Sequence, residues 1–135
     1  MKIDKLIRNG KVGYIYHPSY GGFSAEYNSP LRFNRYLIVF LEENKQILHD
    51  RKRSYDDEIK KKIEDVVKEF FLNNIEMFQG YYERSYSSNP RLLPPLEYLA
   101  VTWIPEGTII EVEDYDGSES INYIANINDD DYVLI

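Results

Sequence analysis

The chain has 135 residues, of which 43% are hydrophobic and 29% charged, and its formal net charge is −7. An aromatic content of 15%, including 13 Tyr, is too high for a disordered chain, so we expect one globular domain over residues 1–135. The absence of Cys excludes a disulfide framework and a cysteine zinc site. No apolar run is long enough to cross a membrane, and residues 1–5 lack a signal-peptide core. We therefore expect a cytoplasmic protein without membrane association.

Charge is distributed unevenly along the chain. Residues 1–53 carry ten Lys and Arg against five acids, whereas residues 54–135 carry six against 18. From Ile104 onward there are nine acidic residues and no Lys or Arg. Because a phosphate backbone repels a chain of this net charge, we expect no general binding to nucleic acid. A solvated acidic surface and a surface for a basic partner both fit this distribution.

The N-terminal half is typical of a hairpin followed by a helix. Asn9 and Gly10 lie between apolar segments and tolerate the positive φ angles of a type I′ turn, so they predict a β-hairpin. Residues 31–33 predict a short strand, and Asn34 is a suitable N-cap for a short helix that follows. Segment 36–40 would also suit a buried strand.

A long amphipathic helix is the clearest element. From about residue 55 to 74, apolar residues recur at helical spacing and charged residues occupy the opposite positions. Ser54, with Asp57 three residues later, resembles a capping box at the start of this helix. The apolar stripe consists of Ile59, Ile63, Val66, Val67, Phe70, Phe71 and Ile75.

The C-terminal third is typical of antiparallel strands joined by tight turns. Its Pro-Glu-Gly and Asp-Gly sequences favour turns, and residues 108–113 alternate between apolar and acidic side chains, as in a strand with one face in water. We predict an α+β fold in which the long helix packs on one face of an antiparallel sheet, preceded by the shorter helix. The expected strands are 96–104, 108–113, 121–127 and 132–135, with turns at 105–107 and 116–117.

Patterns typical of catalysis or metal binding are lacking. His17 and His49 lie in separate segments, and the chain holds no HExxH pair, no Walker loop and no G-x-S-x-G sequence. We therefore predict a non-catalytic protein without a metal or cofactor. A small hydrolase that depends on one carboxylate or on His17 is the least favoured alternative.

Two segments combine aromatic residues with features that bind anions. In residues 17–24, consecutive glycines let backbone N–H groups approach an anion, and the aromatic rings beside them can stack on a base. Residues 81–86 bring Tyr and Arg together in a predicted loop, a combination common at recognition surfaces. Arginines would neutralise the phosphates of a nucleotide-like ligand. The candidate ligand-binding residues are Tyr20, Gly21, Gly22, Phe23, Arg32, Tyr82, Arg84 and Arg91.

Residues 103–121 carry a resemblance to a known group of proteins. They read W-I-P-E-G-T-I-I-E-V-E-D-Y-D-G-S-E-S-I, which is similar to the signature W-[VI]-P-x-G-T-x-[FI]-x-[IV]-x-[ED]-Y-D-G-x-E-x-I of small uncharacterised bacteriophage and prophage proteins. The loop at residues 20–23 and the Tyr27-Asn28 pair resemble that group more loosely. The middle of the chain departs from it, with a longer, Lys-rich helix and an extra Tyr-rich segment. The resemblance implies a phage context in the cytoplasm of a host bacterium.

These observations lead to a favoured function and an alternative. We expect a phage accessory protein that acts in counter-defence by binding and sequestering a small nucleotide-like signalling molecule. The alternative is an inhibitor or immunity-type protein whose acidic face blocks a bacterial defence protein or toxin. A homo-oligomer is possible because Tyr and Phe are favoured at such interfaces. The partner-binding residues of the alternative are Glu111, Glu113, Asp114 and Asp116.

Overall fold

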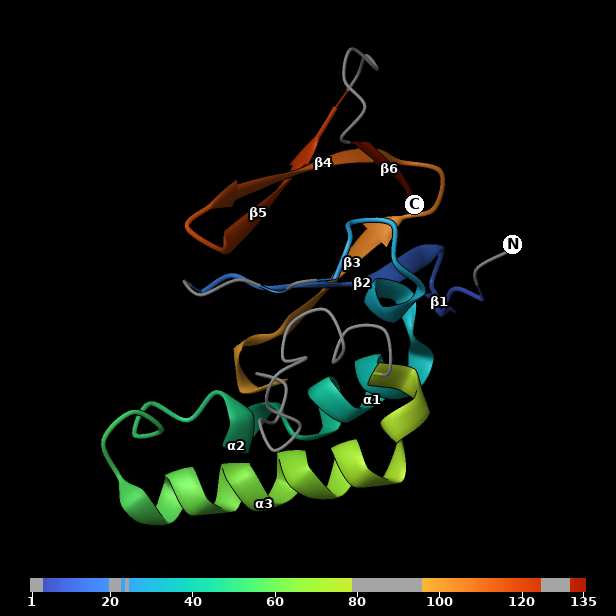
Figure 1. The fold of residues 1–135 in the computed structure, drawn as a ribbon. Coiled ribbons are helices and arrows are strands. Elements are labelled where there is room, and N and C mark those ends of the chain that lie inside the picture. The colour runs from blue at the N-terminus through green and yellow to red at the C-terminus, as the bar shows by residue number, and fades with distance from the viewer. Residues whose placement is uncertain (1–3, 20–22, 24, 79–95, 125–131) are drawn as a thin grey trace.

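The computed structural model describes residues 4–19, 23, 25–78, 96–124 and 132–135. These residues form two antiparallel three-stranded sheets and a group of helices, which confirms the α+β class. Figure 1 shows the two sheets stacked, with the helices on the far side of the lower sheet. The strands are β1 (Ile7–Arg8), β2 (Lys11–Tyr16), β3 (Ala100–Pro105), β4 (Ile109–Tyr115), β5 (Ser118–Tyr123) and β6 (Tyr132–Leu134). The helices are α1 (Arg35–Glu43), α2 (Lys45–Leu48) and α3 (Asp57–Asn73), and the 3₁₀ helices are η1 (Pro30–Phe33), η2 (Ile75–Phe78) and η3 (Leu96–Tyr98).

The first sheet pairs the N-terminal hairpin with a strand from the C-terminal third, in the order β1-β2-β3. The predicted hairpin is confirmed: Asn9 and Gly10 have φ angles of 52° and 74°, both in the left-handed region that a type I′ turn requires. On its other side β2 pairs with β3, with Tyr14 opposite Thr102. β3 is therefore an edge strand of this sheet.

The second sheet has the order β5-β4-β6. Its central hairpin turns at Asp116 and Gly117, whose φ angles are 51° and 86°. The predicted turn that leads from β3 to β4 also forms, with Gly107 at a φ of 88°. The Asp-Gly and Pro-Glu-Gly signals were therefore correct.

β2 is buried on both faces and separates two hydrophobic cores. Its side chains alternate, so Val12 and Tyr14 pack between the sheets while Ile15 packs against the helices. Gly13 lies between them, where a Cβ atom would meet Ile38 Cδ1 at 2.9 Å and the Trp103 ring at 3.3 Å. Glycine is needed here because the indole and α1 approach the strand closely. The core between the sheets consists of Val12, Tyr14, Phe33, Ile104, Ile110, Val112, Val133 and Ile135.

The helices form two layers beneath the first sheet. The side chain of Asn34 accepts a hydrogen bond from Leu37 N, so its predicted role as N-cap of α1 is confirmed. α3 lies on the same side of the sheet, with α1 between it and the strands (Figure 1). Phe40 of α1 and Phe70 of α3 join the layers by ring stacking at a centroid distance of 4.1 Å.

Two local predictions need correction. Residues 31–33 form the 3₁₀ helix η1 instead of a strand, because Pro30 starts the turn and Ser29 Oγ accepts from Leu31 N. The cap of α3 is Asp56, whose carboxylate accepts from Glu58 N and Ile59 N, rather than Ser54.

Two strand boundaries also differ from the prediction. Residues 96–98 form η3, so the strand expected from residue 96 begins only at Ala100. The strand expected over 121–127 spans Ser118–Tyr123, because the tight turn at 116–117 lets pairing start at once. Residues 125–127 lie outside the described residues.

Candidate functional site

The outward face of the second sheet presents acidic and aromatic side chains. Along β4, Ile110 and Val112 are 0% and 5% exposed and pack against the first sheet. Glu111, Glu113 and Tyr115 therefore alternate onto the opposite face. Tyr115 is 72% exposed.

Cross-strand neighbours extend this face on both sides of β4. Glu111 lies opposite Asn122 of β5 and Tyr132 of β6, and Glu113 lies opposite Ser120. Leu134 of β6 adds an apolar side chain that is 57% exposed. We call the following set the acidic face: Glu111, Glu113, Tyr115, Ser120, Asn122, Tyr132 and Leu134.

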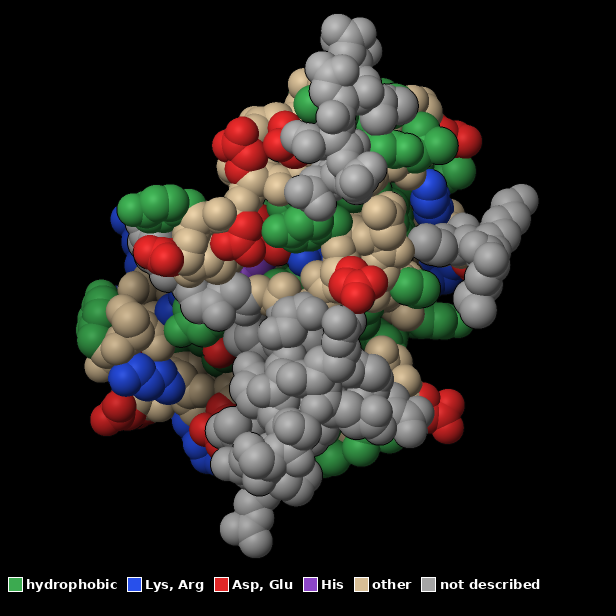
Figure 2. Space-filling view, turned by 45° about the horizontal axis from the view of Figure 1, so that its top comes forward, with side chains coloured by type: hydrophobic (Ala, Val, Ile, Leu, Met, Phe, Trp, Pro, Cys, Tyr) green, Lys and Arg blue, Asp and Glu red, His purple; other side chains and the backbone are tan. Residues whose placement is uncertain are grey.

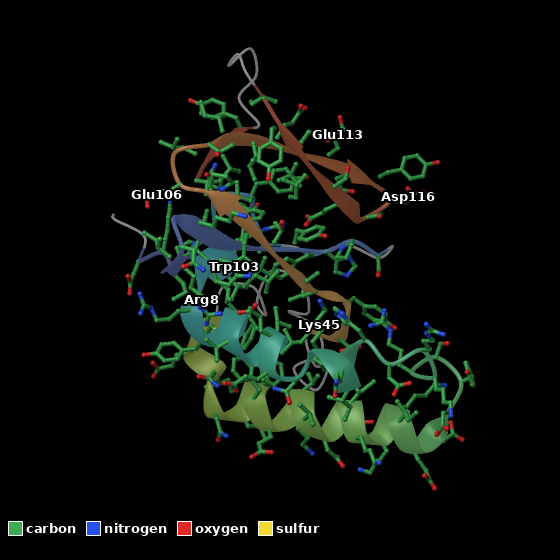
Figure 3. The ribbon with its side chains drawn as sticks, turned by 180° about the vertical axis from the view of Figure 1, so that it is seen from behind. Arg8, Lys45, Trp103, Glu106, Glu113 and Asp116 are labelled. Carbon is green, nitrogen blue, oxygen red and sulfur yellow. The ribbon has the colours of Figure 1, made fainter. Side chains whose placement is uncertain are left out.

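The β4–β5 turn separates two acids of different character. Asp114 Oδ1 accepts a hydrogen bond from Gly117 N at 2.7 Å, so this carboxylate holds the turn closed. Asp116 is exposed at the tip of the turn. Figure 3 shows Asp116 and Glu113 at this end of the upper sheet and Glu106 at the opposite end. Of the four acids predicted to bind a partner, Asp114 therefore has a structural role as well.

The acids of this face have no ion-pair partner in the part of the chain that the structure describes. Within the described ranges, the four ion pairs join Arg8 to Glu42, Arg32 to Glu119, Arg35 to Asp4 and Lys61 to Asp65. None involves the acidic face. Figure 2 shows acidic side chains around the uppermost layer, whereas most basic side chains lie lower, around the helices. The face therefore presents a negative potential to its surroundings.

A buried ion pair anchors the second sheet to the first. The Arg32 guanidinium meets the Glu119 carboxylate twice, with Nη1–Oε1 and Nη2–Oε2 distances of 2.6 and 2.8 Å. Glu119 also accepts from His17 N at 2.8 Å, and its own N–H donates to His17 O at 2.7 Å. This network ties β5 to the end of β2 and so fixes the position of the acidic face relative to the first sheet.

Two predicted ligand-binding residues belong to this interior network. Arg32 is 0% exposed, and its remaining donors reach Ala25 O at 2.7 Å and Glu26 O at 3.2 Å. Phe23 is 7% exposed, and the centroid of its ring lies 4.7 Å from the Arg32 guanidinium. The structure thus brings Arg32 and Phe23 together, but Glu119 occupies the position that we assigned to a phosphate. Six other candidates lie outside the described residues: Tyr20, Gly21, Gly22, Tyr82, Arg84 and Arg91.

A cleft of about 450 Å³ lies between α3 and η3, and no residue of it was among our candidates. Arg53 is held at its edge by hydrogen bonds to Leu48 O and Glu97 O, and its guanidinium lies 4.8 Å from the Tyr98 ring centroid. Lys60 of α3 is on the opposite wall. The sequence signal is weak, because Arg53 ends a short basic run, residues 51–53, of a kind that is common in solvated linkers. Tyr98 comes from a distant segment.

Burial affects one carboxyl group at this cleft. Desolvation raises the pKa of Glu97, and a backbone hydrogen bond together with the attraction of Arg53 and His17 offsets this only in part. His17 itself is 1% exposed, and its Nδ1 lies 2.6 Å from Ser19 O, an acceptor to which the ring donates. In the described part of the chain, no three His, Asp or Glu side chains are grouped to hold a metal ion.

Comparisons with protein-family models, with curated proteins and with solved structures found no significant match. Among the residues that the structure describes, no helix is long and apolar enough to span a membrane. The function has to be argued from the residues of this chain.

Proposed function

We propose that this protein binds another protein through the acidic face of its second sheet. The observation that carries the proposal is the outward row of half-buried Glu111 and exposed Glu113 and Tyr115, whose acids have no ion-pair partner among the described residues. A partner with a basic surface would supply the countercharge. Long-range attraction would speed the encounter, and the exposed tyrosine would add rigid apolar contact area.

The resemblance to phage and prophage proteins suggests the class of partner. In that context the partner would be a bacterial defence protein or a toxin that the chain blocks. The rigid attachment of β5 through the Arg32–Glu119 pair supports this use. A face that keeps its shape on binding loses less conformational entropy than a flexible one.

A capture experiment with a matched control tests the proposal. The test variant is Glu111→Gln with Glu113→Gln, and the control is Glu69→Gln with Glu76→Gln, which removes two exposed charges from the helical side. Each immobilised protein is incubated with a lysate of host bacteria. We expect a partner that wild type and control retain and the test variant loses. Equal retention by all three proteins would contradict the proposal.

A second candidate function is specifically favoured by the cleft between α3 and η3. Its volume of about 450 Å³ falls in the range of small-molecule sites, about 300–1,000 Å³. Tyr98 offers a ring for stacking on a base, and Arg53 and Lys60 offer positive charges for a phosphate. The cleft would therefore suit the nucleotide-like ligand of our favoured sequence hypothesis.

Calorimetric titration with adenosine monophosphate tests this second candidate. Tyr98→Ala and Lys60→Glu are expected to weaken binding, while Lys62→Glu, which makes the same charge change outside the cleft, leaves it unaltered. Binding of equal strength in all three variants would contradict it.

A further inference from the structure

Among the residues that the structure describes, the outer edge of β3 has no strand paired with it. Gly13 N donates to Leu6 O on the β1 side of β2, at 3.1 Å. Because N–H directions alternate along a strand, the even-numbered residues of β2 face β3 and pair with its even-numbered residues, such as Thr102. The N–H and C=O groups of Val101 and Trp103 therefore point away from β2. Such a row of free groups can pair with an added strand.

A small cleft lies where α1 and α2 meet β3. The cleft measures about 210 Å³, below the roughly 300 Å³ at which small-molecule pockets begin, so it fits a side chain better than a free ligand. It lies on the face of the first sheet to which Val101 and Trp103 belong. Alternate side chains of a strand added along β3 would point to the same face. The apolar lining consists of Leu41, Leu99, Ala100, Val101 and Trp103.

The indole of Trp103 is held in place at this cleft. Its Nε1 donates to Glu42 Oε2 at 3.2 Å, and the Arg8 guanidinium lies 5.0 Å from its ring centroid. Arg8 Nη1 in turn pairs with Glu42 Oε1 at 2.8 Å. A wall that is already ordered needs no rearrangement when a side chain enters.

The rim of the cleft carries one lysine, Lys45, and one acid, Glu42, whose charge is already paired with Arg8. Lys45 and His49 line it and are exposed, and Lys45 has no ion-pair partner among the described residues. Figure 3 shows Lys45 and Arg8 on either side of Trp103. Charge complementarity therefore favours an occupant with a carboxylate near its inserted side chain.

We propose that the open edge of β3 binds an extended peptide segment of another protein by strand addition. One apolar side chain of the peptide enters the cleft beside Trp103, and an acidic residue meets Lys45. Main-chain hydrogen bonds to Val101 and Trp103 supply affinity, and the cleft supplies specificity. This site is separate from the acidic face and does not rest on the function proposed for it.

Selection from a displayed library of random heptapeptides tests this site on the full chain. The selected peptides are titrated against wild type, with fluorescence of Trp103, the one Trp in the chain, as the readout. Val101→Pro removes the outward N–H from an edge position, where proline is tolerated, and Val101→Thr keeps that N–H. We expect affinity to fall at least tenfold in Val101→Pro and less than twofold in Val101→Thr. Lys45→Glu weakens binding several-fold, whereas Lys62→Glu does not.

A ligand-side measurement keeps the test valid if Val101→Pro fails to fold. N-methylation of the peptide amides that face β3 is expected to abolish binding, and methylation of the intervening amides is not. Failure to enrich any peptide, equal binding of Val101→Pro and Val101→Thr, or insensitivity to the position of N-methylation would overturn the proposal. So would a homodimer in light scattering that Val101→Pro dissociates, because the occupant would then be a second copy of the chain.

Discussion

Replacement of Arg32 by Met is expected to destabilise the fold strongly, because the Arg32–Glu119 pair joins η1, which contacts β2 through Ile15 O, to β5 of the second sheet. The two side chains have exposed fractions of 0% and 1%. Without the guanidinium, the Glu119 carboxylate stays buried and keeps only the His17 N–H as a donor among the described residues. An uncompensated charge in an apolar interior is the main energetic consequence.

The magnitude follows from the contacts that are lost. Removal of one partner from a buried ion pair costs about 3–5 kcal/mol. Ala25 O also loses its 2.7 Å donor, which adds about 1 kcal/mol. We expect Arg32→Met to lower the free energy of unfolding by about 4–6 kcal/mol in total. For a chain of this length that corresponds to a fall in Tm of about 15–25 °C.

Urea denaturation followed by Trp103 fluorescence and far-UV circular dichroism measures this effect. The double variant Arg32→Met with Glu119→Leu leaves neither charge unpaired, so it is expected to regain about 2 kcal/mol relative to Arg32→Met. A cost below about 1 kcal/mol for Arg32→Met, or additive costs in the double variant, would refute a structural role for this pair. Arg32 would then be free to serve a ligand.

Three further predictions concern single positions. Gly13→Ala is expected to cost about 1–3 kcal/mol in urea unfolding and to shift the emission of Trp103, because the new Cβ would press on the indole. Asp114→Ala lowers stability by about 1–2 kcal/mol through the loss of its bond to the turn, whereas Asp116→Asn leaves it unchanged because Asn tolerates a positive φ. The pKa of Glu97 is raised in the folded state, so folding favours the neutral carboxyl group. The stability that this group contributes is present below pH ~4 and is lost as the pH rises through the raised pKa. Glu97→Gln is therefore expected to stabilise the protein at pH 7 and not at pH 4, and equal effects at both pH values in thermal melts would contradict this.

Features determined by neighbouring residues could be predicted from the sequence. The Asn9-Gly10 and Asp116-Gly117 turns formed as expected, because positive φ angles are a property of the residues themselves. The cap at Asn34 and the long helix were equally predictable from local patterns. The cap of α3 was predicted at Ser54 and is Asp56, because several polar residues precede this helix and each can act as a cap.

Features that depend on distant contacts could not be predicted. Residues 31–33 have side chains that suit a strand, yet Arg32 is drawn into the interior by Glu119, 87 positions away. We expected one sheet, but the strands form two sheets. Nothing in the sequence of β4 shows whether this strand pairs with β3 or stacks above it. The clefts beside Tyr98 and Trp103 likewise join segments that are far apart in the chain.

The rate of association with the captured partner, measured by stopped flow at increasing salt, tests the proposed function most directly. For wild type and for the Glu69→Gln, Glu76→Gln control, we predict a rate constant that falls about tenfold or more as salt screens the acidic face. The Glu111→Gln, Glu113→Gln variant is predicted to associate more slowly at low salt and to approach wild type at high salt. Equal rates for the two double variants at low salt would contradict binding through this face.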